Sequence, residues 1–333
     1  SDDLYHILRK RLFETIATED EKHEIAMGYK EAAKEAKQMN YTNLSSEQLY
    51  TGIKDAYPFH PSIKDLFARF KENPGFQQTR GFIRLTRIMV KNLYSGDKPK
   101  AKSRYLLNAF DIDLNNSEMF SMVRSIKPRL TNAISHDIAQ QGKAVAEEID
   151  SVMKSQDMQD LSKLLLVSSL GDVTGVLNGL SLQEALGIMV KPGRNITEIK
   201  GALEEFKVKA WYLYTDRDNR LYFKDVKNVN AELLSLVDTY SDEIAKQEIR
   251  KILNDKFLPE LKDCYQEVEV FPAIDEIEVK QDKVMLILFE PNPNGVGLQK
   301  DLAEFYENIK YKNRVIFLTG QRNSMENLLA VSK

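Results

Sequence analysis

Residues 161 to about 224 constrain the fold most, because the helices, turns and strands of this segment are each marked by local chemistry. A leucine-rich helix comes first. Ser181-Leu182-Gln183-Glu184 then predicts a capping box, in which the side chains of the serine and the glutamate each accept a hydrogen bond from the other's backbone amide. A Lys-Pro-Gly turn precedes Asn195, which opens a second helix. Strands rich in aromatic and β-branched residues follow at 208–214 and 220–224. This order predicts a winged helix.

The residues before this segment carry helical patterns only. A charged, alanine-rich pattern predicts a helix from Glu19 to about Gln38, and apolar spacing predicts another from about Gln78 to Tyr94. A longer helix should begin at Ser117 and be kinked by Pro128. Residues 140–160 are polar and are predicted to form a helical connector.

The last hundred or so residues alternate between strand and helix patterns. Residues 284–289 are a continuous apolar run, as in sheets that are covered on both faces. A loop at 291–297 and a helix lead to a second buried strand at 315–318, and an earlier strand is expected near 268–271. Such a β-α-β unit predicts parallel pairing with a right-handed crossover. Glu290 follows the apolar run as a metal-site carboxylate would, but a core strand explains the run better.

Together, these patterns predict a mainly α fold with a winged helix and a small C-terminal α/β unit. A chain of 333 residues has room for two or three hydrophobic cores. The predicted domains are a helical lid-like domain at 1–115, a helical connector at 116–160, the winged helix at 161–230 and an α/β subdomain at 231–333.

Composition excludes several classes of protein. No apolar run approaches the roughly 20 residues of a membrane helix. A single cysteine, Cys264, fits a reducing compartment, and the four scattered histidines do not have metal-site spacing. We therefore expect a cytoplasmic protein with no membrane partner. The chain opens on Ser1 without a signal peptide and closes on a helical pattern, as expected of a segment of a longer protein.

A phosphate-binding loop is not found. Gly142-Lys143 is the one Gly-Lys pair in a suitable setting, but Asp137 stands where the motif needs its first glycine and Ala144 where it needs a hydroxyl. The chain alone is therefore expected to bind no ATP and to be no enzyme, and no cofactor is expected in it.

Basic residues are concentrated between Lys64 and Arg104. This stretch holds eleven basic and three acidic residues, in a chain whose net charge is −3. Such an excess favours an anionic neighbour, either nucleotide phosphates or a nucleic-acid backbone. The alternative is a solvated helix face whose charge is balanced by the acidic stretch 14–35.

Short motifs along nearly the whole chain resemble the prokaryotic "domain of unknown function 499" family. They are Tyr57-Pro58-Phe59-His60-Pro61, the run Gly75-Phe76-Gln77-Gln78-Thr79-Arg80-Gly81, Trp211-Tyr212-Leu213, Leu221-Tyr222-Phe223 and Asn228-Val229-Asn230, with an opening motif at 8–13 and a closing one at 313–318. The resemblance implies large AAA+-like P-loop proteins, often encoded beside DNA methyltransferases and helicases in presumed phage-defence clusters. The family's phosphate loop lies upstream of the matched region, and this sequence lacks it.

The resemblance also implies a role for the first basic helix. In AAA+ proteins a lid-helix arginine, termed sensor 2, reaches the γ-phosphate. Arg80 follows a Gly-Phe turn at a helix start and is the candidate by resemblance, with Arg84 as the alternative. Arginine suits the role because its charge is fixed and its fork is planar.

Five basic residues of the predicted winged helix are candidates for contact with DNA phosphates. They are Lys191, Arg194, Lys200, Arg217 and Arg220. The acidic neighbours Asp216, Asp218 and Glu198 leave a protein-docking role open, since near-neutral winged helices commonly bind proteins.

The function that we expect is that of a C-terminal fragment of an AAA+-like ATPase from a DNA-modification or phage-defence system. ATP and magnesium would belong to the parent protein. Expected partners are the upstream ATPase core, DNA, and a DNA methyltransferase or helicase. The alternatives are a stand-alone winged-helix regulator and a non-catalytic scaffold for a methyltransferase or helicase.

Overall fold

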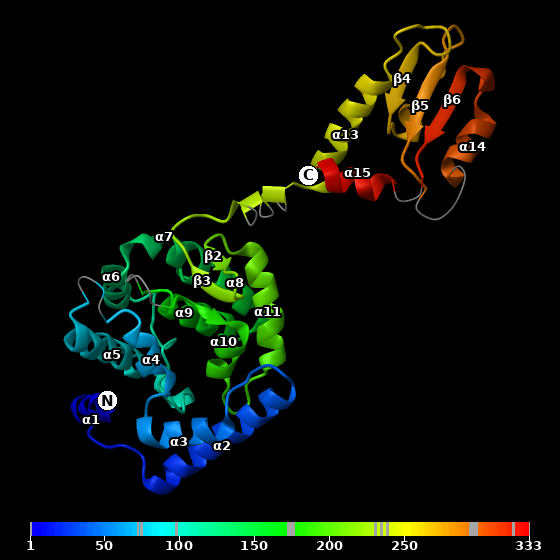
Figure 1. Cartoon of the computed structure of the whole chain (residues 1–333). Coiled ribbons are helices and arrows are strands. Elements are labelled where there is room, and N and C mark those ends of the chain that lie inside the picture. Colours follow the sequence, from blue (N-terminus) through cyan, green and yellow to red (C-terminus); the bar gives the residue numbers. More distant parts are fainter. Residues whose placement is uncertain are drawn as a thin grey trace. The chain divides into compact units, whose positions relative to one another are not determined.

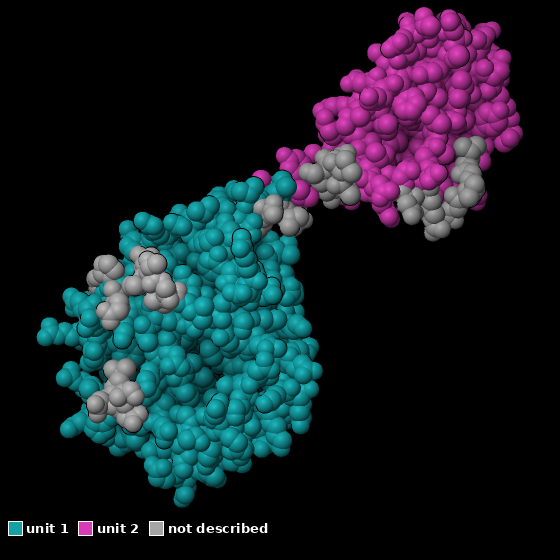
Figure 2. Space-filling model, in the orientation of Figure 1, with its two compact units in different colours: residues 1–234 teal, residues 235–333 magenta. Residues whose placement is uncertain are grey.

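The chain divides into two compact units, residues 1–234 and residues 235–333 (Figures 1 and 2). The computed structural model describes residues 2–71, 73, 76–96, 99–171, 177–229, 232–233, 236–237, 240–292, 299–321 and 324–332. The fold is mainly helical with two small sheets, as predicted. One hydrophobic cluster runs through unit 1 from Tyr5 to Phe223, so the segments predicted as lid, connector and winged helix share a core.

Unit 1 begins with five helices. Their bounds are α1 Asp2–Leu12, α2 Glu19–Gln38, α3 Ser46–Ala56, α4 Ser62–Ala68 and α5 Gln78–Tyr94. The helices predicted from Glu19 to about Gln38 and from about Gln78 to Tyr94 are confirmed. Thr18 starts α2 through a capping box with Glu21, and α2 and α3 pack along each other. Of the Gly75–Gly81 motif, Gly75 lies outside the described residues.

The middle of unit 1 corrects one prediction. Its elements are η1 Lys100–Ser103, α6 Ser117–Ile126, η2 Pro128–Leu130, α7 Thr131–Ala133, the π-helical turn η3 Ile134–Ile138 and α8 Val145–Met153. The long kinked helix from Ser117 was wrong, because α6 ends at Ile126. Pro128 disfavours helical backbone at the preceding residue, and Lys127 has φ −145° and ψ 85°.

The last part of unit 1 holds a three-stranded antiparallel sheet. Its elements are α9 Asp157–Ser168, β1 Leu180–Ser181, α10 Leu182–Met189, α11 Ile196–Lys209, β2 Leu213–Thr215 and β3 Arg220–Phe223, and the strand order is β1-β3-β2. The caps at Ser181 and Asn195 are confirmed. The strand predicted at 208–214 was too long, because α11 continues to Lys209. Strand β1, which pairs with β3 at Leu180 and Leu221, was not predicted.

Unit 2 contains a three-stranded parallel sheet of order β4-β5-β6. Its elements are α13 Asp242–Phe257, β4 Glu267–Val270, η4 Ile274–Glu276, β5 Met285–Phe289, α14 Lys300–Asn308, η5 Lys312–Arg314, β6 Val315–Thr319 and α15 Ser324–Ser332. The parallel β-α-β unit is confirmed, and Ile287 of its central strand is fully buried. The prediction that the strand at 315–318 is buried was wrong, because β6 lies beside β5 with Ile316 and Leu318 42% and 41% exposed. Glu290 forms an ion pair with Lys246 at 3.1 Å. The loop predicted at 291–297 lies largely outside the described residues.

Candidate nucleic-acid and nucleotide interface

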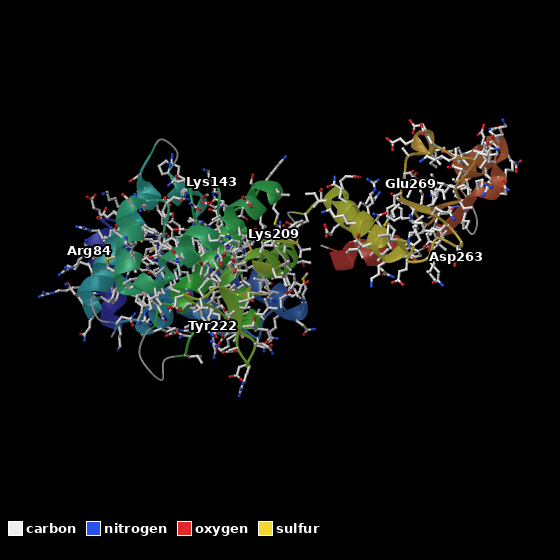
Figure 3. The ribbon with its side chains drawn as sticks, turned by 90° about the horizontal axis from the view of Figure 1, so that it is seen from above. Arg84, Lys143, Lys209, Tyr222, Asp263 and Glu269 are labelled. Carbon is white, nitrogen blue, oxygen red and sulfur yellow. The ribbon has the colours of Figure 1, made fainter. Side chains whose placement is uncertain are left out.

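One face of α5 consists of basic side chains. Arg80, Arg84, Arg87 and Lys91 are all exposed, at spacings of four, three and four residues, which keep them on one side of a helix. Figure 3 shows Arg84 at the outer edge of unit 1. Lys91 lies 3.3 Å from a carboxylate oxygen of Glu118, whereas the three arginines have no ion pair within the described part of the chain. Three guanidinium groups on this face are therefore available to an anion.

The ion pairs of the acidic helix α2 lie away from this face in the described part of the chain. Its ion pairs join Lys22 to Glu19, Lys34 to Glu31 and Lys30 to Glu47 of α3, and among the described residues no ion pair links α2 to α5. The structure thus gives no support to the alternative in which the acidic stretch 14–35 balances the basic stretch.

Arg194 and Arg220, two of the predicted DNA contacts, lie inside the unit. The Arg194 side chain is 1% exposed, with Nε 2.8 Å from Asp157 and Nη2 2.5 Å from Asp160. Arg220 lies with Nη2 2.9 Å from Glu184 and donates to the carbonyl of Gly179 at 2.9 Å. Because both guanidinium groups are used within the fold, the prediction that they face DNA is corrected.

The other three predicted DNA contacts remain at the surface to different degrees. Lys200 is exposed on α11, with its ammonium 5.6 Å from the ring centre of Tyr41. Arg217 is exposed in the turn between β2 and β3. Lys191 is half-buried, and this burial lowers the pKa of its ammonium. Lys200 and Arg217 are thus the side chains of this set that a phosphate could reach most readily.

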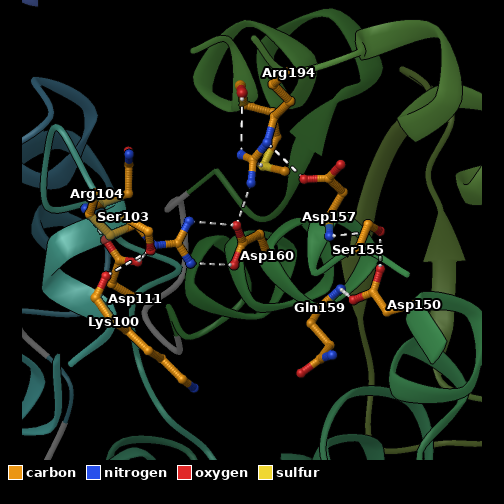
Figure 4. A network of polar contacts seen from close by, with 12 residues as sticks. Lys100, Ser103, Arg104, Asp111, Asp150, Ser155, Asp157, Gln159, Asp160 and Arg194 are labelled. Carbon is orange, nitrogen blue, oxygen red and sulfur yellow. Dashed lines mark hydrogen bonds and ion pairs between the residues drawn. The ribbon is translucent and has the colours of Figure 1, made fainter. Parts of the chain in front are cut away.

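A buried network of charges centres on Asp160 (Figure 4). Arg104 donates to both oxygens of Asp160, at 3.0 and 3.1 Å, and Arg104 Nε lies 3.1 Å from Asp111. Burial raises the pKa of Asp111 to about 6, even though Arg104 acts in the opposite direction. Burial also opposes the charge of Asp160, but Arg104 and Arg194 prevail and lower its pKa. The network ties the segment after η1 to α9 and to the start of α11.

Sequence reasoning missed this network. Arg104 and Asp160 are 56 residues apart, and Arg194 is a further 34 residues away. No spacing rule for helices or strands relates residues at such separations. The one available signal was a pair of acidic residues at the start of a helix, which is also the ordinary pattern of a helix N-terminus.

The turn at Gly142 holds a carboxylate of the chain itself. Glu147 Oε2 accepts hydrogen bonds from the backbone amides of Gln140, Gly142 and Ala144, at 2.8, 2.8 and 3.1 Å. Its Oε1 accepts one from Asn115 at 2.6 Å. Burial opposes the carboxylate charge, but these hydrogen bonds lower the pKa of Glu147. The amides that a phosphate would need at the Gly142-Lys143 pair are therefore already occupied by Glu147.

A pocket of about 570 Å³ lies between α3, α4, β1 and α10. Charged side chains on its wall include Asp65, Arg69 and Glu184, and the buried His60 also lines it. His60 Nδ1 accepts a hydrogen bond from the Ser62 amide at 3.2 Å, and burial lowers the pKa of the imidazole to about 4. The neutral ring is thus a structural group near neutral pH. Within the described residues no group of three or more His, Cys, Asp or Glu could hold a metal ion.

No helix that the structure describes is both long and apolar enough to cross a membrane. The family model described as the DUF499 second domain matches residues 1–223, which is most of the chain and almost all of unit 1. No curated protein and no solved structure matches the chain. Unit 2 begins at residue 235, beyond the matched range. With 223 of its 333 residues matched, the chain belongs to the DUF499 family.

Proposed function

We propose that this chain is a non-catalytic component of a larger AAA+-like ATPase that engages DNA, of the kind used in DNA-modification or phage-defence systems. The observation that supports the proposal is the order of helices and strands in residues 157–223, which we interpret as a winged helix. In this fold a helix, a short strand and two helices joined by a turn precede a β-hairpin, whose return strand pairs with the first strand. The order α9-β1-α10-α11-β2-β3 with sheet order β1-β3-β2 fits this description.

The nucleotide-binding part of the proposal rests on resemblance. The matched model is a second domain, which fits a family whose phosphate loop lies in an earlier domain. ATP and magnesium would be held there. Arg80, at the start of α5, would sense the γ-phosphate, with Arg84 as the alternative one turn further on. Their exposure and lack of partners in the described part of the chain are compatible with this role.

In the proposed winged helix, α11 would be the recognition helix and the β2–β3 turn the wing. Lys200 and Arg217 would contact phosphates, and Lys191 would contribute less because it is half-buried. Arg194 and Arg220 are left out because their charges are used within the fold. Two or three phosphate contacts make a weak DNA-binding surface.

Salt dependence of DNA binding tests this proposal. Each neutralised phosphate contributes about −0.9 to the slope of log affinity against log salt. Replacing both Lys200 and Arg217 by alanine should therefore make the slope shallower by about 2. The measurement is fluorescence anisotropy of the chain with a short labelled duplex at several salt concentrations. The matched control replaces Lys34 and Lys37, two exposed lysines of α2, and should leave the slope unchanged.

The acidic neighbours of the wing favour a second candidate function. Asp216, Asp218 and Glu198 lie beside the basic positions, so the module could dock a protein such as a methyltransferase or helicase and serve as a scaffold. Absence of DNA binding at low salt would favour this candidate. A stand-alone winged-helix regulator is the remaining alternative, and a gene without an upstream phosphate loop would favour it.

A further inference from the structure

We propose that the basic face of α5 binds the sugar-phosphate backbone of a nucleic acid over several nucleotides. The face consists of Arg80, Arg84, Arg87 and Lys91, and Tyr94 lies at its C-terminal end. The inference rests on the proposed engagement of DNA, and it names a second surface, outside the proposed winged helix, that makes the contact.

The length of the face points to a row of phosphates. An α-helix rises about 1.5 Å per residue, so Arg80 and Lys91 lie about 16 Å apart along the axis, and Tyr94 lies about 5 Å beyond. With about 100° per residue, these positions stay within an arc of about 80°. A sensor for one γ-phosphate needs one or two residues at a single point. An extended anion would account for the remaining cations of this face.

The basic face has almost no acidic partners among the described residues. Helix α5 contains no Asp or Glu, and Glu118 beside Lys91 is the one acidic partner that the described residues supply to its exposed cations. Three of the four cations are arginines, whose planar fork binds phosphate oxygens in pairs. Duplex DNA carries about one negative charge per 1.7 Å of axis, so several phosphates would lie within reach of a stripe of this length.

The basic face of α5 has little apolar surface, which favours a nucleic acid over an acidic protein as its ligand. Protein interfaces have an apolar centre, whereas the one exposed large hydrophobic side chain described on this helix is Tyr94 at its end, 58% exposed. A tyrosine at the end of a basic stripe can stack on an unpaired base, as in proteins that bind single strands. The face therefore fits a nucleic acid better than a protein partner.

The inner side of α5 holds the helix in place independently of the stripe. Phe82, Leu85, Ile88 and Met89 are buried, and the ring of Phe82 packs edge-to-face on that of Phe67 at 4.8 Å. Substitutions on the outer side should consequently leave the fold intact, so the charge of the basic face can be reversed by mutation without unfolding the chain.

The test compares two charge reversals by anisotropy with a labelled duplex and a labelled single strand. Arg87→Glu with Lys91→Glu should lower affinity at least about tenfold and make the salt slope shallower by about 2. Lys34→Glu with Lys37→Glu on α2 carries the same change of charge and should have a far smaller effect. Tyr94→Ala should weaken single-strand binding about tenfold and leave duplex binding nearly unchanged. Circular dichroism and thermal melting establish that each variant is folded.

Three outcomes would overturn the inference. If the α5 reversal leaves binding unchanged while alanines at Lys200 and Arg217 reduce it, the proposed winged helix binds DNA and the α5 face does not. If unlabelled polyglutamate displaces the labelled strands as well as DNA does, the face is a docking surface for an acidic protein. If the unsubstituted chain binds neither duplex nor single strand at low salt, the inference and the proposed DNA engagement fail together.

Discussion

Arg194 precedes α11, where its position in the sequence suggests a DNA contact, but its guanidinium lies between Asp157 and Asp160. The partners of a charged side chain decide its role. Arg80, Arg84 and Arg87 have no partner in the described part of the chain and remain available to a ligand, whereas Arg194 and Arg220 are used to hold elements together. Because these partners come from distant parts of the chain, charge counting along the sequence could not separate the two groups.

Removing the Arg194 side chain should destabilise unit 1. Arg194→Ala leaves Asp157 without its cation and Asp160 with Arg104 alone, and breaking a buried pair typically costs about 3–5 kcal/mol. Lys200→Ala, six residues further on at the surface, should cost less than about 0.5 kcal/mol. Urea unfolding of both variants measures the difference. Equal stability of the two would mean that the network contributes nothing to the fold.

His60 should make the free energy of unfolding depend on pH between the pKa values of its folded and unfolded states. Burial holds the pKa of the folded imidazole at about 4, below its ordinary value of 6.5. Between these values the unfolded chain binds a proton at His60 that the folded chain does not, so stability falls as the pH is lowered through the window. From about pH 7 to about pH 5, the loss should be about 2 kcal/mol.

His60→Asn isolates this effect. Asparagine stays neutral and can still accept the Ser62 amide hydrogen bond, so the variant should lose less stability than the unsubstituted chain between about pH 7 and about pH 5. The measurement is urea unfolding at the two pH values. An identical loss in both proteins would contradict the buried, neutral state of His60.

Elements with strong local signals were the ones that the sequence predicted well. Helix α2 follows from its charged, alanine-rich pattern, α5 follows from apolar periodicity, and β5 and β6 follow from unbroken apolar runs. Predictions failed where tertiary contacts decide. Strand β1 has two residues and exists through its pairing with β3, and α11 includes Val208 and Lys209, the first two residues of the segment that was predicted as a strand.

The turn before α8 offers a prediction at the scale of an element. Glu147 bonds three backbone amides of residues 140–144, so Glu147→Ala would leave those donors without their acceptor and should cost about 3 kcal/mol. Glu148→Ala, at an exposed neighbouring position of the same helix, should be nearly neutral. Thermal melting of the two variants tests this contrast. A similar melting temperature for both would show that the Glu147 hydrogen bonds do not stabilise the turn.

At the scale of the molecule, unit 1 joins the basic helix α5 and the module 157–223 through one hydrophobic core and the Arg104–Asp160–Arg194 network. This continuity was not predicted, because helical periodicity locates elements but does not say which of them share a core. It matters for function, because the proposed nucleotide-facing arginine and the proposed DNA-facing module belong to the same compact unit.

The central claim, that this chain is a component of an ATPase and holds no nucleotide itself, is tested most directly by ATP turnover. The complete gene product and this chain alone should be assayed side by side with magnesium. We expect turnover by the complete protein, a reduction of about ten- to a hundredfold on Arg80→Ala, a smaller reduction on Arg84→Ala, and none by the chain alone. Turnover by the chain alone, or none by the complete protein, would contradict the account.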